Sequence, residues 1–135
     1  MAVGYSGTPL IKKLGIKEGF KITIVNAPDN YFTLLGELPD NVQIIEDTDR
    51  PFYSVHIFTH TISEMGDLMQ LYMDKISRDG MIWVSWHKKA SKLPSEITED
   101  DVRNTALSLG MVDVKVCAVD EKWSGLKIAI RVENR

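Results

Sequence analysis

Apolar residues follow two kinds of pattern along the chain: short runs, and repeats at helical spacing. The short runs lie at 21–27, 42–46, 53–59 and 81–86. The last of them, MIWVSW, is apolar on both faces, which is typical of a central strand covered by helices on either side. Strands that alternate with helices predict an α/β fold with a parallel sheet and right-handed crossovers.

Capping residues mark where two short helices between these runs begin and end. Thr8-Pro9 predicts a first helix that ends at Gly15. Asp29 or Asn30 is expected to cap a second helix that runs to Leu35.

The clearest helix follows the third apolar run. Thr61 and Glu64 form a capping-box pattern, in which each side chain would satisfy a backbone N–H of the other residue. Gly80 is expected to end the helix. Its apolar residues follow at helical spacing: Ile62, Met65, Leu68, Met69, Tyr72 and Ile76.

The C-terminal part of the chain changes character. Thr98 predicts a further helix that stops at Gly110, and apolar residues then alternate with more polar ones at 112–118 and 126–132. The residues between them, 120–125, are rich in turn formers. This pattern predicts an antiparallel hairpin at a sheet edge.

Composition and charge narrow the class of protein. The 135 residues, 44% of them apolar and 26% charged, predict one globular domain over 1–135. A net charge of -3 makes nucleic acid an unexpected partner. The chain has one cysteine, Cys117, no recognisable secretory signal and no long apolar stretch, so we expect a cytoplasmic protein without a membrane contact.

The segment at 10–27, LIKKLGIKEGFKITIVNA, and the hairpin at 112–132 resemble the start and the closing strand pair of class I methyltransferases. This resemblance implies a Rossmann-like, three-layer domain with a mostly parallel sheet in the order 2-1-3-4-6-5 and one strand–helix unit missing. Only about six residues separate Glu46 from Tyr53, whereas parallel crossovers usually take about a dozen. Either that link is an extended loop, or the second strand is not a regular member of the sheet.

Three runs carry a closer resemblance, SGTPLIKKLGIK at 6–17, DGMIWVSWHKKAS at 79–91 and VDVKVCAVDEKWSGLKI at 112–128. They resemble a family of small bacterial proteins of unknown function. The likeness covers nearly the whole chain. It implies a fold and no activity.

The loop after the first strand bears on cofactor binding. Rossmann-like sites use glycines there because the backbone must approach the ligand closely. The loop at 25–30, VNAPDN, has no glycine, and Pro28 removes a backbone donor. Glu46 lies where an acidic residue would hold ribose hydroxyls, but without the glycines it is only part of the dinucleotide-binding motif. No cofactor and no metal are expected.

Two groups of side chains remain candidates for a ligand site. Ligands of open α/β sheets lie beyond the carboxyl ends of the strands where the strand order reverses. That crevice would gather Asn26, Asp29, Thr59, His60, Trp86 and His87. The lysines of the adjoining run, Lys88, Lys89 and Lys92, could bind an anion. Alternatively, all of these are loop caps and solvated tips, with the acidic stretch 96–101 neutralising the lysines.

Two further residues have alternative interpretations. His56, within an apolar run, is expected to be a hydrogen-bonded core residue. Trp123 is either folded back onto the sheet or exposed as an anchor for a protein partner or a second copy.

We therefore expect a non-catalytic binding or regulatory module on a degenerate methyltransferase-like scaffold. The alternative is a small enzyme or a ligand- or anion-binding protein that uses the crevice at the strand ends.

Overall fold

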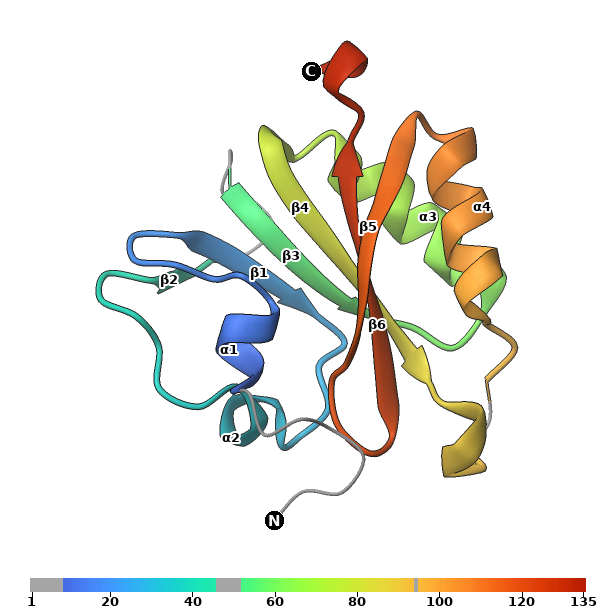
Figure 1. The fold of residues 1–135 in the computed structure, drawn as a ribbon, viewed down its shortest axis with the longest axis horizontal. Coiled ribbons are helices and arrows are strands. Elements are labelled where there is room, and N and C mark those ends of the chain that lie inside the picture. The colour runs from blue at the N-terminus through green and yellow to red at the C-terminus, as the bar shows by residue number, and fades with distance from the viewer. Residues whose placement is uncertain (1–8, 46–51, 94) are drawn as a thin grey trace.

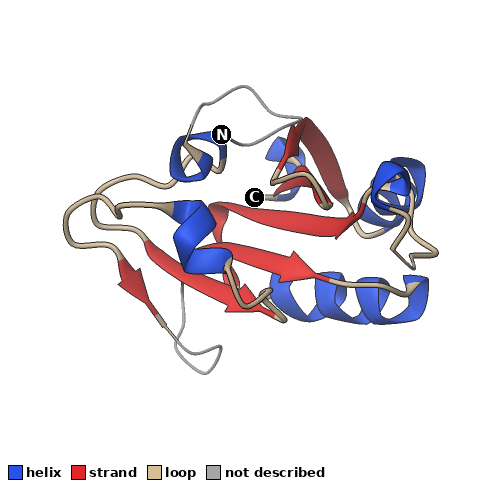
Figure 2. Ribbon diagram, turned by 90° about the horizontal axis from the view of Figure 1, so that it is seen from below, coloured by secondary structure: helices blue, strands red, loops and turns tan. Residues whose placement is uncertain are grey.

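The computed structural model describes residues 9–45, 52–93 and 95–135. The chain forms one mixed six-stranded sheet with helices on both faces (Figures 1 and 2). The helices are α1 (Leu10–Lys13), α2 (Tyr31–Leu35), α3 (Ile62–Met73) and α4 (Glu99–Ser108), with short 3-10 helices η1 (Lys89–Ser91) and η2 (Val132–Asn134). The strands are β1 (Lys21–Val25), β2 (Gln43–Ile44), β3 (Phe52–Phe58), β4 (Ile76–His87), β5 (Met111–Ala118) and β6 (Trp123–Ile130).

The strand order is β2-β1-β3-β4-β6-β5, which confirms the order implied by the resemblance to class I methyltransferases. Strands β2, β1, β3 and β4 run parallel, and β6 joins β4 antiparallel and forms the terminal hairpin with β5. β2 is short, but it pairs in parallel with β1 through Lys21–Gln43 and Ile22–Ile44. The second strand is therefore a regular member of the sheet, while Glu46 and the rest of the link at 46–51 lie outside the described residues.

Each face of the sheet is covered by a different pair of helices. On one face α3 and α4 pack against Val55, Val84 and Ile128 of the central strands. On the other face α1 and α2 pack around Phe58 and Trp83. Figure 2 shows the strands between these two layers, which is the three-layer arrangement predicted from the alternation of elements.

The boundary between α3 and β4 differs from the prediction. α3 ends at Met73, and Ile76 and Gly80 belong to β4, so the prediction that Gly80 ends the helix is wrong. A Cβ atom at Gly80 would lie 2.3 Å from the backbone oxygen of Tyr53. Glycine is thus required because the backbones of β3 and β4 approach each other closely at this point.

The helix starts follow the predicted caps in part. Thr98 and Asp101 form a complete capping box at α4. At α3 the Thr61 side chain accepts a hydrogen bond from Glu64 N at 3.2 Å, but the Glu64 carboxylate accepts from Thr59 instead of returning to Thr61. Asn30 precedes α2 without a side-chain cap, and the predicted Thr8 cap lies outside the described residues.

Candidate functional site

The crevice between β1 and β3, where the strand order reverses, is bridged by Asn26. This residue ends β1 in a left-handed conformation with φ 59°. Its Nδ2 donates a hydrogen bond to the backbone oxygen of Phe58 at 3.3 Å. The amide expected to contact a ligand therefore links the two strand ends to each other, and Asp29 on the following loop is exposed.

Thr59 and His60, which follow β3, have different environments. Thr59 is fully buried, and its hydroxyl donates to the Glu64 carboxylate at 2.6 Å. Its backbone N–H donates to Ser85 O at 3.1 Å. Thr59 is thus occupied in joining β3 to β4 and α3, whereas His60 is exposed.

His60, His87 and Trp123 form an aromatic cluster at the carboxyl end of the sheet. The ring centroids of His87 and Trp123 are 4.0 Å apart, and those of His60 and His87 are 4.7 Å apart. Trp123 begins β6, is only 7% exposed and packs edge-on against Phe58. It is folded back onto the sheet, so the alternative of an exposed anchor is wrong.

The lysine run borders a groove at the carboxyl end of β4, on the side of α4. We call it the lysine groove; its volume is about 480 Å³. It brings together five of the residues predicted from the sequence, Trp86, His87, Lys88, Lys89 and Lys92. The other residues that line it were not predicted: Leu93, Ser95, Glu96, Ile97, Thr98, Glu99 and Ser124.

Both carboxylates of the lysine groove are engaged by the rest of the fold. Glu96 accepts a hydrogen bond from the backbone N–H of Ile62 at 2.8 Å and so caps the start of α3. Glu99 forms an ion pair with Arg103 one turn further along α4. The acidic stretch therefore does not neutralise the lysines, which have no carboxylate within ion-pair distance in the part of the chain that the structure describes.

A buried hydrogen-bond chain crosses the layer between α2 and the sheet. His56 Nδ1 lies 2.9 Å from the Tyr31 hydroxyl, and His56 Nε2 lies 2.7 Å from Ser85 Oγ. All three side chains are at most 3% exposed. Burial lowers the pKa of His56 to about 3 and raises the pKa of Tyr31.

This chain confirms the prediction that His56 is a hydrogen-bonded core residue. Its partners could not be paired from the sequence, although a polar residue inside the apolar run around Ser85 was a signal that it needs one. The three side chains are sealed from solvent, so they form a structural link and not an accessible reaction site.

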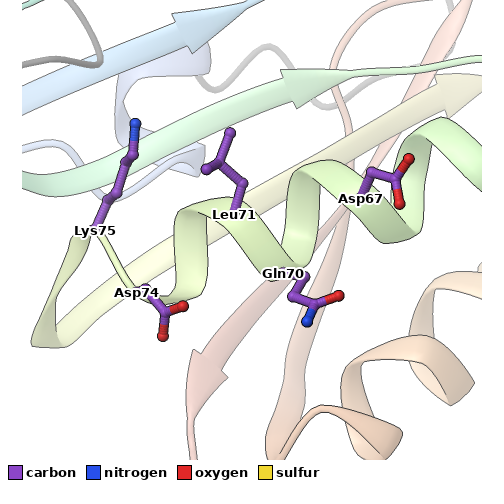
Figure 3. A pocket seen from close by; sticks show the side chains of 5 residues that line it. All are labelled: Asp67, Gln70, Leu71, Asp74 and Lys75. Atoms are coloured by element: carbon purple, nitrogen blue, oxygen red, sulfur yellow. The ribbon is translucent and has the colours of Figure 1, made fainter.

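A second hollow, of about 410 Å³, lies on the outer surface of α3 and its C-terminal end. Figure 3 shows the side chains that line it, and they spread along this one segment without converging on a point: Asp67, Gln70, Leu71, Asp74 and Lys75. This hollow shares no lining residue with the lysine groove, and none of the predicted site residues lines it.

Metal-ligating side chains do not cluster in the part of the chain that the structure describes. Within 9–45, 52–93 and 95–135, no group of three or more histidine, cysteine, aspartate or glutamate side chains is placed to hold a metal ion. No helix in these ranges has the length and apolar character needed to cross a bilayer.

Comparison with known proteins gives the fold. No protein-family model and no curated protein matches the chain. A SAM-dependent methyltransferase from Aquifex aeolicus is similar in structure, with a TM-score of 0.61 and 15% identity over 90% of this chain and 88% of that one. Magnesium protoporphyrin IX methyltransferase from Synechocystis PCC 6803 has a TM-score of 0.54 and 8% identity over 90% of this chain and 78% of its own.

Other solved structures extend the likeness. The ribosomal protein L11 methylase from Lactobacillus delbrueckii subsp. bulgaricus has a TM-score of 0.55 and 12% identity over 90% of this chain and 75% of its own. The chain has the Rossmann-like fold of class I methyltransferases. At these identities the likeness gives the architecture, and no named relative supplies a function.

Proposed function

We propose that the protein is a non-catalytic binding module on a methyltransferase-like scaffold, and that the lysine groove holds an organic anion. One observation carries the proposal. The two carboxylates that line the groove, Glu96 and Glu99, are engaged by α3 and by Arg103, whereas the groove's lysines have no carboxylate partner among the described residues. The groove therefore offers uncompensated positive charge beside the end of a central strand.

The lining of the groove supports an anion with an apolar body. Lys88, Lys89 and Lys92 provide ammonium groups, which bind anions as point charges. Leu93, which is 39% exposed, and the indole of Trp86 provide an apolar surface next to them. A carboxylate or sulfonate carried on a hydrocarbon or aromatic group fits this combination best.

The non-catalytic part of the proposal rests on the former cofactor side of the sheet. The loop after β1 lacks glycine, and Asn26 uses its amide to bridge β1 and β3. The group with the strongly lowered pKa, His56, is enclosed by Tyr31 and Ser85. The alternative of an enzyme at this crevice would need such a group within reach of a substrate.

Titration with 1-anilinonaphthalene-8-sulfonate, a fluorescent organic anion, tests the groove. We expect saturable binding that weakens about tenfold in the double variant Lys89→Gln/Lys92→Gln, equivalent to losing about 1.4 kcal/mol. Lys21→Gln is the matched control. Lys21 is the first residue of β1, whereas the groove lies at the carboxyl end of β4, so this variant should bind like the parent protein. Equal affinity in all three proteins would refute the proposal that the lysine groove binds the anion.

Thermal unfolding in the presence of adenosylmethionine and adenosylhomocysteine tests the non-catalytic part. A ligand that binds only the folded state raises the unfolding midpoint, by about 2.7 kcal/mol of stabilisation at one hundred times its dissociation constant. We expect no shift. A shift with either compound would contradict the loss of cofactor binding, while leaving the anion groove to be judged by its own titration.

A further inference from the structure

Two lysines lie directly opposite each other on the terminal hairpin. Lys115 of β5 pairs in register with Lys127 of β6. Leu126 and Ile128 point into the core beneath α3 and α4, so Lys127 between them points to the other face, toward the α1 side. Lys115 is exposed on that same face and Lys127 is half-buried. In Figure 1, α1 and α2 lie beside this hairpin. The strand register places the like-charge pair on the face of the hairpin that is on the α1 side.

A third lysine, Lys17, lies between α1 and β1 and acts electrostatically on Lys127. The end of α1 is fixed to the sheet because Trp83 Nε1 donates a hydrogen bond to Leu14 O at 3.0 Å. Partial burial lowers the pKa of Lys127, and the positive charges of Lys115 and Lys17 lower it further. The ammonium groups of Lys115 and Lys17 thus both act electrostatically on that of Lys127.

No carboxylate lies within ion-pair distance of these lysines in the part of the chain that the structure describes. The nearest acidic residue along β5, Asp113, is separated from Lys115 by a β-bulge and accepts a hydrogen bond from Arg103 Nε at 3.0 Å. The bulge directs Asp113 toward α4 and Lys115 toward the opposite face. Among the described residues, Lys17, Lys115 and Lys127 form no ion pair.

Like charges directly opposite each other in antiparallel strands are destabilising, so this arrangement costs stability unless an anion is bound. We propose that Lys17, Lys115 and Lys127 form a binding site for the di- or triphosphate group of a small ligand. Three lysines offset most of the negative charge of one such group. Nucleic-acid binding, by comparison, takes roughly six to ten phosphate contacts.

This site is distinct from the lysine groove. The groove lies on the α4 side of the sheet and has an apolar wall, whereas the hairpin lysines lie on the α1 side. A phosphate chain has no apolar body, so it favours the hairpin lysines, and the two sites can be tested separately.

Isothermal titration with sodium tripolyphosphate is the direct test. We expect saturable binding at one site that weakens about tenfold or more in Lys115→Gln/Lys127→Gln and is retained in Lys115→Arg/Lys127→Arg. The groove variant Lys89→Gln/Lys92→Gln is the control and should bind tripolyphosphate unchanged. Both lysines are at least partly exposed, so the variants should fold, which circular dichroism would verify.

Three outcomes would overturn the proposal. The first is equal affinity of the parent protein and Lys115→Gln/Lys127→Gln. The second is loss of binding only in the groove variant, which would assign the phosphate to the lysine groove. The third is tighter binding of single-stranded oligothymidylate than of tripolyphosphate, lost in the same hairpin variant, which would identify a nucleic-acid surface.

Discussion

The buried hydrogen-bond chain gives a sharp test of what holds α2 on the sheet. Replacing Tyr31 by phenylalanine removes one hydroxyl and keeps the ring, which packs edge-on against His56 and Phe58 with centroids 5.3 and 5.5 Å away. His56 Nδ1 would then lose its partner at a site that is 3% exposed. A buried polar atom left without a partner costs about 1–3 kcal/mol.

This free energy can be converted into a thermal shift. An unfolding entropy of about 2.1 cal/mol/K per residue gives about 0.28 kcal/mol/K for a chain of this length. The unfolding midpoint of Tyr31→Phe should therefore fall by roughly 4–10 °C. Urea unfolding, monitored by tryptophan fluorescence and by far-ultraviolet circular dichroism, should give the same loss of free energy with an unchanged slope against urea.

Tyr53→Phe is the matched control. Tyr53 loses the same hydroxyl, but that hydroxyl has no hydrogen-bond partner among the described residues, and its ring contact with Phe20, with centroids 4.2 Å apart, is retained. Its free energy of unfolding should stay within about 0.5 kcal/mol of the parent value. If Tyr31→Phe and Tyr53→Phe lose the same amount, the inference that His56 depends on Tyr31 is refuted.

Three further predictions follow from other contacts. The pKa of His56 is about 3 in the folded protein and ordinarily 6.5, so the unfolded chain takes up the proton first. The stability contributed by neutral His56 is complete above pH 6.5 and is lost as the pH falls toward 3, by up to about 1.4 kcal/mol per pH unit. Urea unfolding at pH 7 and pH 5 should show this decrease in the free energy of unfolding. In His56→Gln the free energy of unfolding should depend less on pH. Gly80→Ala should lower the free energy of unfolding by about 1–3 kcal/mol or more, because its Cβ would meet the backbone of Tyr53. Gly66→Ala is the control, since Gly66 has open space around it in α3, and it should be neutral or stabilising. Equal effects of the two substitutions would contradict the close approach of β3 and β4. Lys115→Gln should raise the free energy of unfolding by up to about 1 kcal/mol in low salt without phosphate, and a loss of stability would show that the lysine pair is not repulsive.

Local sequence signals were sufficient for the order of helices and strands along the chain, whereas the strand order within the sheet came from the resemblance to class I methyltransferases. The run MIWVSW and the alternating C-terminal segments place β4 and the hairpin because burial on two faces or on one leaves a distinct period. Ile76 shows the limit of this signal. An apolar residue that continues a helical repeat is buried equally well at the start of the next strand, so spacing alone did not separate α3 from β4.

The site was predicted only where its residues are neighbours in the sequence. Lys88, Lys89 and Lys92 line the lysine groove as one run. Glu96 accepts its hydrogen bond from the start of α3, more than thirty residues earlier in the chain, and no local sequence pattern indicates that contact. The pairing of Lys115 with Lys127 depends on a β-bulge that shifts the register of the hairpin. Both features arise from tertiary structure, so they required the fold.

If the lysine groove binds an anion as proposed, the hydrogen bond from Ile62 N to Glu96 would help the groove to select ligands by the sign of their charge. A cation entering the groove would compete with that backbone N–H for the carboxylate, and the first turn of α3 would lose a capping acceptor. An anion would bind the lysines and leave the hydrogen bond between Ile62 N and Glu96 intact. Discrimination would then come from the fraying of a helix as well as from direct repulsion, and hydrogen exchange at the start of α3 would report which kind of ion occupies the groove.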